Sequence, residues 1–228
     1  YGIALEGGGS VIVDGNTITG ANSDSASYST GIYIKPNQAD IWNLEITNNK
    51  IDRFYLGGID NVVSDVSDST IHQLTIKGNT ITNSGGNAIR LNPYSTSKIL
   101  QTSISGNELT TWNRLNTSNS FAMSAINLAG IDSVSITNNR IYNKGQALRS
   151  DPLYINGVRY SRFTNNNCYG PPSLNYPTLE PRFAGTNTGF VMSSNDGLYG
   201  GTTGEPVVLE RAIGDENTAM TTGTAKLT

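Results

Sequence analysis

The chain has 228 residues, of which 36% are hydrophobic and 14% charged, and its formal net charge is -3. This composition supports a buried core and excludes an intrinsically disordered chain. The absence of a basic cluster disfavours nucleic-acid binding, and no apolar run approaches the roughly 18 residues that a membrane span requires.

The first predicted element is a short strand over Gly2-Ile-Ala-Leu-Glu6, and it recurs along the chain. Further copies are Gly31-Ile-Tyr-Ile-Lys35, Gly58-Ile-Asp-Asn-Val62, Ala88-Ile-Arg-Leu-Asn92, Ala125-Ile-Asn-Leu-Ala129, Pro152-Leu-Tyr-Ile-Asn156 and Gly189-Phe-Val-Met-Ser193. Because side chains alternate along a strand, the second residue of each copy is predicted to point inward. We expect one stack of Ile3, Ile32, Ile59, Ile89, Ile126, Leu153 and Phe190.

The second element is Val11-Ile-Val-Asp-Gly-Asn-Thr-Ile18, which contains an asparagine motif that also recurs. The shared asparagines are Asn16, Asn49, Asn79, Asn107, Asn139 and Asn166, at spacings of 33, 30, 28, 32 and 27 residues. A repeat at this period is typical of a stacked array.

The spacing inside this motif predicts two strands joined by a bend. Apolar residues lie three positions before and two positions after the asparagine, as Val13 and Ile18 do. The apolar positions are thus at odd offsets before the asparagine and at even offsets after it, whereas a single strand would keep alternate residues on one face throughout. The residue before the asparagine is always Gly or Asn, the types that tolerate positive φ. The inward asparagines are predicted to form a ladder of amide hydrogen bonds.

The only cysteine, Cys168, occupies an inward apolar position. A single cysteine excludes a disulfide framework within the chain.

Three short strands per coil and no helical pattern predict an all-β parallel β-helix of about seven coils. The predicted β-helix covers residues 1–200. Residues 201–228 lack the motif and are expected to cap the solenoid or to begin an assembly segment. Because the chain begins inside a repeat at Tyr1, we expect it to be a fragment of a longer protein.

The candidate site lies on the outward face of the Gly-Ile strand, beside loops of variable length. Such loops commonly build the binding face of a solenoid. The outward residues form two columns, Ala4, Tyr33, Asp60, Arg90, Asn127, Tyr154 and Val191, and Glu6, Lys35, Val62, Asn92, Ala129, Asn156 and Ser193. The candidate substrate-binding residues are Tyr33, Lys35, Arg90, Asn92, Asn127, Tyr154 and Asn156, together with Trp112 in a loop.

Glycoside hydrolysis needs two carboxyl groups, about 6.5–9.5 Å apart in inverting enzymes. The candidates are Glu6, Asp60, Glu108 and Asp151, and Glu6 and Asp60 lie two coils apart, roughly 10 Å. An ion pair between Asp60 and Arg90 is the structural alternative. A lyase would instead need a base such as Tyr33 and a cation such as Lys35. The single histidine, His72, has the parity of Leu74 and is expected to be structural.

Coils that read G-I-x-I and then I-x-[GN]-N-x-I resemble the right-handed, single-stranded parallel β-helices of the pectin-lyase-like superfamily. Over about residues 1–200 the resemblance is closest to the central domains of bacteriophage tailspikes and capsule depolymerases. The chain departs from the enzymes of the superfamily. It lacks the polygalacturonase motifs, of which Ile89-Arg90-Leu91 is the nearest trace, and also the alginate-epimerase, pectate-lyase and calcium-nonapeptide signatures.

The resemblance implies a homotrimer on a virion tail that binds and cleaves a bacterial surface polysaccharide, either capsule or O-antigen, and it implies no cofactor or metal. Hydrolysis is favoured over elimination because acids outnumber suitable bases near the face. Two alternatives remain open. One is a non-catalytic glycan-binding adhesin that uses the same face, and the other is a purely structural shaft.

Overall fold

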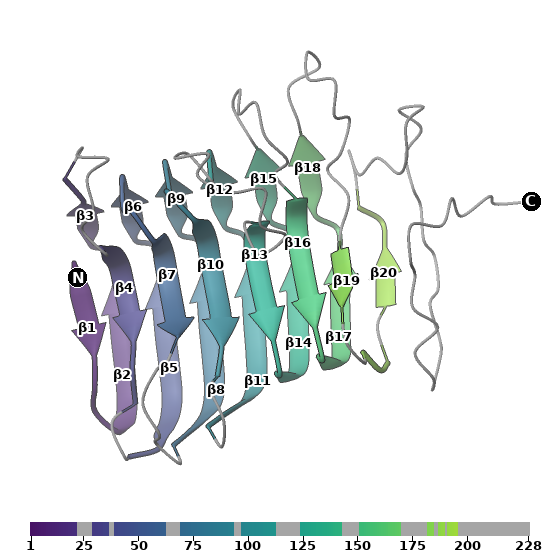
Figure 1. Cartoon of the computed structure of the whole chain (residues 1–228), viewed down its shortest axis with the longest axis horizontal. Coiled ribbons are helices and arrows are strands. Elements are labelled where there is room, and N and C mark those ends of the chain that lie inside the picture. The colour runs from purple at the N-terminus through teal and green to yellow at the C-terminus, as the bar shows by residue number, and fades with distance from the viewer. Residues whose placement is uncertain are drawn as a thin grey trace, which may run out of the picture.

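The structure, a computed structural model, describes residues 1–21, 29–36, 39–62, 69–93, 97–112, 124–142, 151–169, 182–184, 187–189 and 191–195. These residues form an all-β parallel solenoid of three sheets, as predicted, with seven, seven and six strands. Each sheet is named here by its first strand. Figure 1 shows the strands of the β1 sheet side by side, from β1 near the N-terminus to β19 at the far end.

The β1 sheet contains the predicted Gly-Ile strands. Its strands are β1 (Ile3–Leu5), β4 (Thr30–Ile34), β7 (Gly57–Val62), β10 (Asn87–Asn92), β13 (Ser124–Ala129), β16 (Asp151–Asn156) and β19 (Arg182–Ala184). Ile32, Ile59, Ile89, Ile126 and Leu153 are opposite one another and fully buried, which confirms this part of the predicted stack.

The other two sheets flank the asparagine corner. The β2 sheet contains β2 (Gly9–Asp14), β5 (Ile41–Thr47), β8 (Thr70–Lys77), β11 (Lys98–Ser105), β14 (Asp132–Thr137), β17 (Arg159–Thr164) and β20 (Val191–Ser193). The β3 sheet contains β3 (Thr17–Thr19), β6 (Lys50–Asp52), β9 (Thr80–Thr82), β12 (Glu108–Thr110), β15 (Arg140–Tyr142) and β18 (Asn167–Tyr169). Cys168 is buried, as expected.

The predicted asparagine ladder is present and continuous. In its middle, Asn79 Oδ1 accepts hydrogen bonds from the backbone N–H and the side-chain amide of Asn49, at 2.9 and 3.0 Å. Asn79 Nδ2 in turn donates to Asn107 Oδ1 at 3.0 Å and to the backbone oxygen of Ile46 at 2.8 Å. The same pattern repeats along the coils, so buried amides and backbone groups satisfy one another at the corners from Asn49 to Asn166.

The residue before each asparagine has positive φ, as predicted for a bend with one left-handed residue. Examples are Asn48 at 55° and Gly78 at 67°. The ladder continues one coil further than predicted, because Asn195 accepts from Asn166 at 2.9 and 3.0 Å. At this corner Ser194, with φ of 53°, takes the left-handed position. A rule restricted to Gly and Asn therefore missed the seventh corner.

This extra corner corrects the assignment of the last coil. The segment predicted as a Gly-Ile strand, Gly189–Ser193, contains β20 of the β2 sheet, in which Met192 is opposite Phe163. The last strand of the β1 sheet is β19, where Arg182 is opposite Tyr154, so Val191 does not continue the outward column. Phe190 and the predicted cap at residues 201–228 lie outside the described residues.

Candidate functional site

The predicted outward column of the β1 sheet is formed in register. Ala4, Tyr33, Asp60, Arg90, Asn127 and Tyr154 are opposite one another on successive strands. Tyr33 stacks on Tyr1 with ring centroids 4.4 Å apart and planes 5° apart, and Asn127 is buried. The column therefore brings phenol, carboxyl, guanidinium and amide groups together, as the sequence predicted.

Asp60 and Arg90 form a two-point ion pair in this column. Arg90 Nε lies 3.0 Å from Asp60 Oδ1, and Arg90 Nη2 lies 2.5 Å from Asp60 Oδ2. Asp60 is only 1% exposed, and this burial raises its pKa, although the hydrogen bonds and charge of Arg90 act in the opposite direction. The ion pair with Arg90, which was the structural alternative to a catalytic role for Asp60, is therefore formed. Its carboxyl group is buried rather than exposed.

The other candidate acids do not gather around Asp60. Glu6 is exposed just after β1, and Asp151 is buried at the start of β16, opposite Ser124. Glu108 lies on the β3 sheet, where its Oε1 is 3.7 Å from Arg140 Nη1. Of the four candidate acids, Glu6 is thus the solvent-accessible carboxyl on the same sheet face as Asp60.

The predicted binding residues also differ in accessibility. Asn92 is exposed, and Lys35, Tyr154 and Asn156 are half-buried. Trp112 was predicted to contact substrate, but its side chain is fully buried in the hydrophobic core, so this prediction is wrong for the conformation described. A large apolar ring at the end of a strand gains more from burial than from exposure, and the sequence did not distinguish the two settings.

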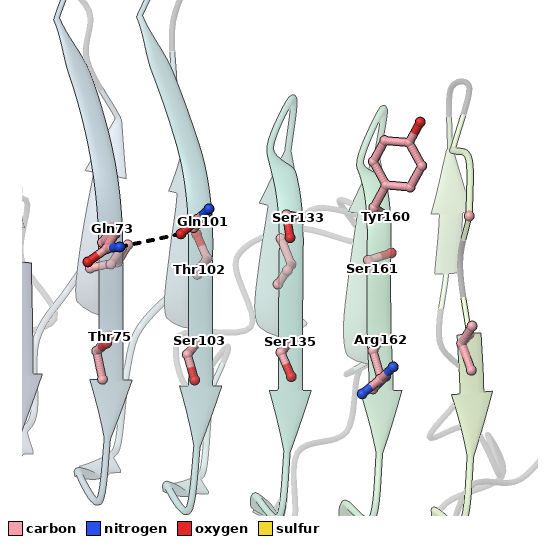
Figure 2. Close-up of a pocket in the computed structure, with 14 residues that line it drawn as sticks. Gln73, Thr75, Gln101, Thr102, Ser103, Ser133, Ser135, Tyr160, Ser161 and Arg162 are labelled. Carbon is pink, nitrogen blue, oxygen red and sulfur yellow. Dashed lines mark hydrogen bonds between the residues drawn. The ribbon is translucent and has the colours of Figure 1, made fainter.

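A groove that the sequence analysis did not predict lies on the outward face of the β2 sheet. It is open, with a volume of about 540 Å³, and crosses β8, β11, β14 and β17 as far as Val191 at the start of β20. Figure 2 shows its labelled polar side chains on neighbouring strands. Two rows of residues line it, Gln73, Gln101, Ser133 and Tyr160, and Thr75, Ser103, Ser135 and Arg162. Leu74, Thr102, Val134 and Ser161 lie between them.

The groove arises from a local break in the alternation of side chains. In β8, Ile71 and Leu74 are both buried although they are three residues apart, so His72 and Gln73 are two successive outward residues. His72 is therefore on the outer face, where its ring stacks on Trp42, and its predicted inward parity is wrong. Strict period-two alternation cannot reveal such a site. The available signal was the three-residue spacing of the apolar residues.

Tyr160 has the least favourable backbone conformation in the groove. Its φ is 51°, a region that bulky residues rarely adopt, and its side chain is 71% exposed. A large ring held at the surface in a conformation that costs on the order of 1–3 kcal/mol is a feature that clusters at binding sites. Ser133, in the same row on the preceding strand, also has positive φ, at 55°.

The two arginines of β17 have different environments. Arg159 forms hydrogen bonds of 2.6 Å with both carboxylate oxygens of Asp132, and these bonds raise the pKa of Arg159. Arg162 lies in the groove, and within the described part of the chain it makes no hydrogen bond or ion pair. Its guanidinium is therefore available to a ligand.

Comparison with known proteins supports the fold. A family model described as "right handed beta helix region" matches residues 30–196, which is most of the chain. The chain belongs to this right-handed β-helix family. No curated protein and no solved structure matches it.

Two further observations on this right-handed β-helix concern metal-binding groups and membrane-spanning helices. Over the described residues, no group of three or more His, Cys, Asp or Glu side chains is placed to hold a metal ion. Across the same ranges, no helix has the length and apolar character required to cross a membrane.

Proposed function

We propose that this β-helix binds an extended polysaccharide along the groove of the β2 sheet. The observation that carries the proposal is the lining of the groove by amide, hydroxyl and guanidinium groups, with the exposed ring of Tyr160 at one end. Sugar hydroxyls pair with such donors and acceptors, and an aromatic ring stacks on the C–H face of a sugar. A right-handed β-helix fits a carbohydrate-active or adhesin-like protein.

The ligand that best suits the proposal is a bacterial surface glycan, either capsule or O-antigen. Strands repeat about every 4.8 Å along the solenoid, so the groove offers similar polar groups at regular intervals to a chain of sugars. Gln73 and Gln101 illustrate this repetition, because their side-chain amides lie opposite one another, with Nε2 and Oε1 at 3.5 Å.

Binding is tested with the full chain on an array of purified capsular and O-antigen polysaccharides, followed by calorimetry on those that bind. Gln101→Ala removes a neutral hydrogen-bonding group, and Arg162→Ala removes a charged one. We expect each substitution to weaken binding about 5- to 10-fold. The matched control is Lys50→Ala, which removes an exposed cation from the β3 sheet. Equal losses in Lys50→Ala and Arg162→Ala would contradict the proposal.

A second candidate function is cleavage of the same glycan at the face of the β1 sheet, as in a tailspike-type depolymerase. The observation that favours it is a second candidate carboxyl on the same sheet face as Asp60, since glycoside hydrolysis uses a pair of carboxyl groups. Glu6 is the exposed carboxyl on the same face. Hydrolysis is proposed ahead of elimination.

Cleavage is tested by incubating the chain with the polysaccharides that it binds. New reducing ends indicate hydrolysis, and the ultraviolet absorbance of an unsaturated uronate indicates elimination. Glu6→Gln is expected to lower cleavage about 100-fold or more with an unchanged circular dichroism spectrum, because Glu6 is exposed and its removal leaves the core intact. Full activity in Glu6→Gln would remove this residue from the mechanism.

We further propose that the protein acts as a homotrimer in a virion tail, outside the host cell. This proposal rests on the resemblance to tailspikes. Light scattering of the full chain is expected to give the mass of three subunits, and a monomeric mass would contradict it.

A further inference from the structure

Trp42 is a large aromatic side chain on the outer face of the β2 sheet, and 60% of it is exposed. One face of its ring is covered by His72, with ring centroids 4.0 Å apart and planes 9° apart. Nε2 of His72 lies 3.2 Å from Oδ2 of Asp40, and Asp40 Oδ1 accepts the backbone N–H of Thr70 at 2.8 Å. The ring is therefore held in one orientation although it is exposed.

The opposite face of the Trp42 ring points toward the preceding coil, because His72 lies in the following one. The register there is irregular. Gly9 is opposite Ile41 and Ser10 is opposite Asn43, so no residue of β2 is opposite Trp42. The chain just before this point is Gly7-Gly8-Gly9, which has no side chains.

Space is open beside Gly7 and Gly9, whereas a Cβ atom at Gly8 would lie 2.6 Å from the backbone oxygen of Asp40. A Cβ atom added at Gly7 or at Gly9 would meet no heavy atom within 4 Å. Over the part of the chain that the structure describes, no other ring stacks on Trp42. One face of the indole is thus supported by His72, and the other is exposed.

The Trp42 ring adjoins the groove of the β2 sheet. Ile41 is opposite Ile71 and Leu44 is opposite Leu74, so Trp42 and Asn43 lie beside His72 and Gln73, the first groove residue. Tyr160 lies in the same row as Gln73, on β17. From β5 to β17 there are four coil steps, about 19 Å, which is room for several sugar rings.

We infer that the exposed face of Trp42 is a stacking subsite for a pyranose ring of the glycan that lies in the groove. This inference rests on the proposed function. The C–H face of the sugar packs on the indole, and its hydroxyls reach the polar side chains of Asn43 and Glu45 on the same strand. A flat ring supported by a second ring, with one open face and a polar rim, matches a sugar. It is too small an apolar surface for a stable protein partner, which needs about 800 Å² per side.

The experiment measures acrylamide quenching of tryptophan fluorescence in the full chain, with and without the capsular and O-antigen polysaccharides of the array. Trp42 is exposed and Trp112 is fully buried, so the quenchable signal comes from Trp42. We expect a bound polysaccharide to protect this signal. Trp42→Leu is expected to weaken binding about 3- to 10-fold, and Trp42→Phe, which keeps a flat ring, to retain most of the affinity.

The outcomes separate this inference from the proposed function. If a polysaccharide binds and Arg162→Ala weakens it, but quenching is unchanged and Trp42→Leu binds normally, the subsite is wrong and groove binding stands. If Trp42→Phe and Trp42→Leu lose affinity equally, apolar burial rather than ring stacking is responsible, and the inference is also wrong. If no polysaccharide of the panel binds, both the proposed function and the inference are overturned.

Discussion

The asparagine ladder is expected to contribute more to stability in its middle than at its exposed end. In Asn79→Ala, the backbone N–H of Asn49 loses its acceptor and the backbone oxygen of Ile46 loses its donor. Both groups are buried. Each unsatisfied buried group costs about 1–3 kcal/mol, so the substitution is predicted to lower the free energy of unfolding by about 2–6 kcal/mol.

The matched control is Asn16→Ala, at the exposed first rung. Asn16 Nδ2 donates to Asn49 Oδ1 and to the backbone oxygen of Asp14, and the second of these bonds is exposed. Asn49 Oδ1 still accepts the backbone N–H of residue 16 after the substitution, as it does from Asn16 at 2.9 Å. The cost is therefore expected to stay below about 1 kcal/mol.

Both variants are compared by urea denaturation, with the far-ultraviolet circular dichroism of the β-sheets and the fluorescence of buried Trp112 as two probes. Coincident transitions with both probes would justify a single free energy of unfolding for each variant. Equal midpoints for Asn79→Ala and Asn16→Ala, at equal denaturant sensitivity, would refute the reasoning that buried rungs stabilise the solenoid by satisfying backbone groups.

The remaining predictions concern a buried charge and a close packing contact. Arg90→Met leaves the Asp60 carboxylate buried without its cation and is expected to cost about 3 kcal/mol at neutral pH. Because burial already raises the pKa of Asp60, removing Arg90 raises it further. The variant should therefore lose stability as the pH rises above about 4, the ordinary pKa of an aspartate, and a pH-independent cost in thermal melts would contradict this. Gly58→Ala places a Cβ against Ile81 Cγ2 and should lower the melting temperature by an amount equivalent to about 1–3 kcal/mol. Gly7→Ala, which has open space, should leave it unchanged.

Several features of this β-helix follow from the sequence alone. Ile46 and Ile51 flank Asn49 with opposite parity, and the residue before it tolerates positive φ, so the strand, bend and strand are encoded within eight residues. Alignment of these segments on their shared asparagine then fixes which residues are opposite one another. For the same reason the sequence predicted the pairing of Asp60 with Arg90, whose coils are adjacent.

Other features were decided only by the tertiary structure. The burial of Asp60 and of Trp112 depends on what surrounds each side chain in space, and residue type does not reveal it. The groove depends on two successive outward residues in each strand, and the open face of Trp42 depends on a register shift between Gly9 and Ser10. The physical reason is that a repeat sets each coil locally, whereas burial and accessibility are properties of several coils stacked together.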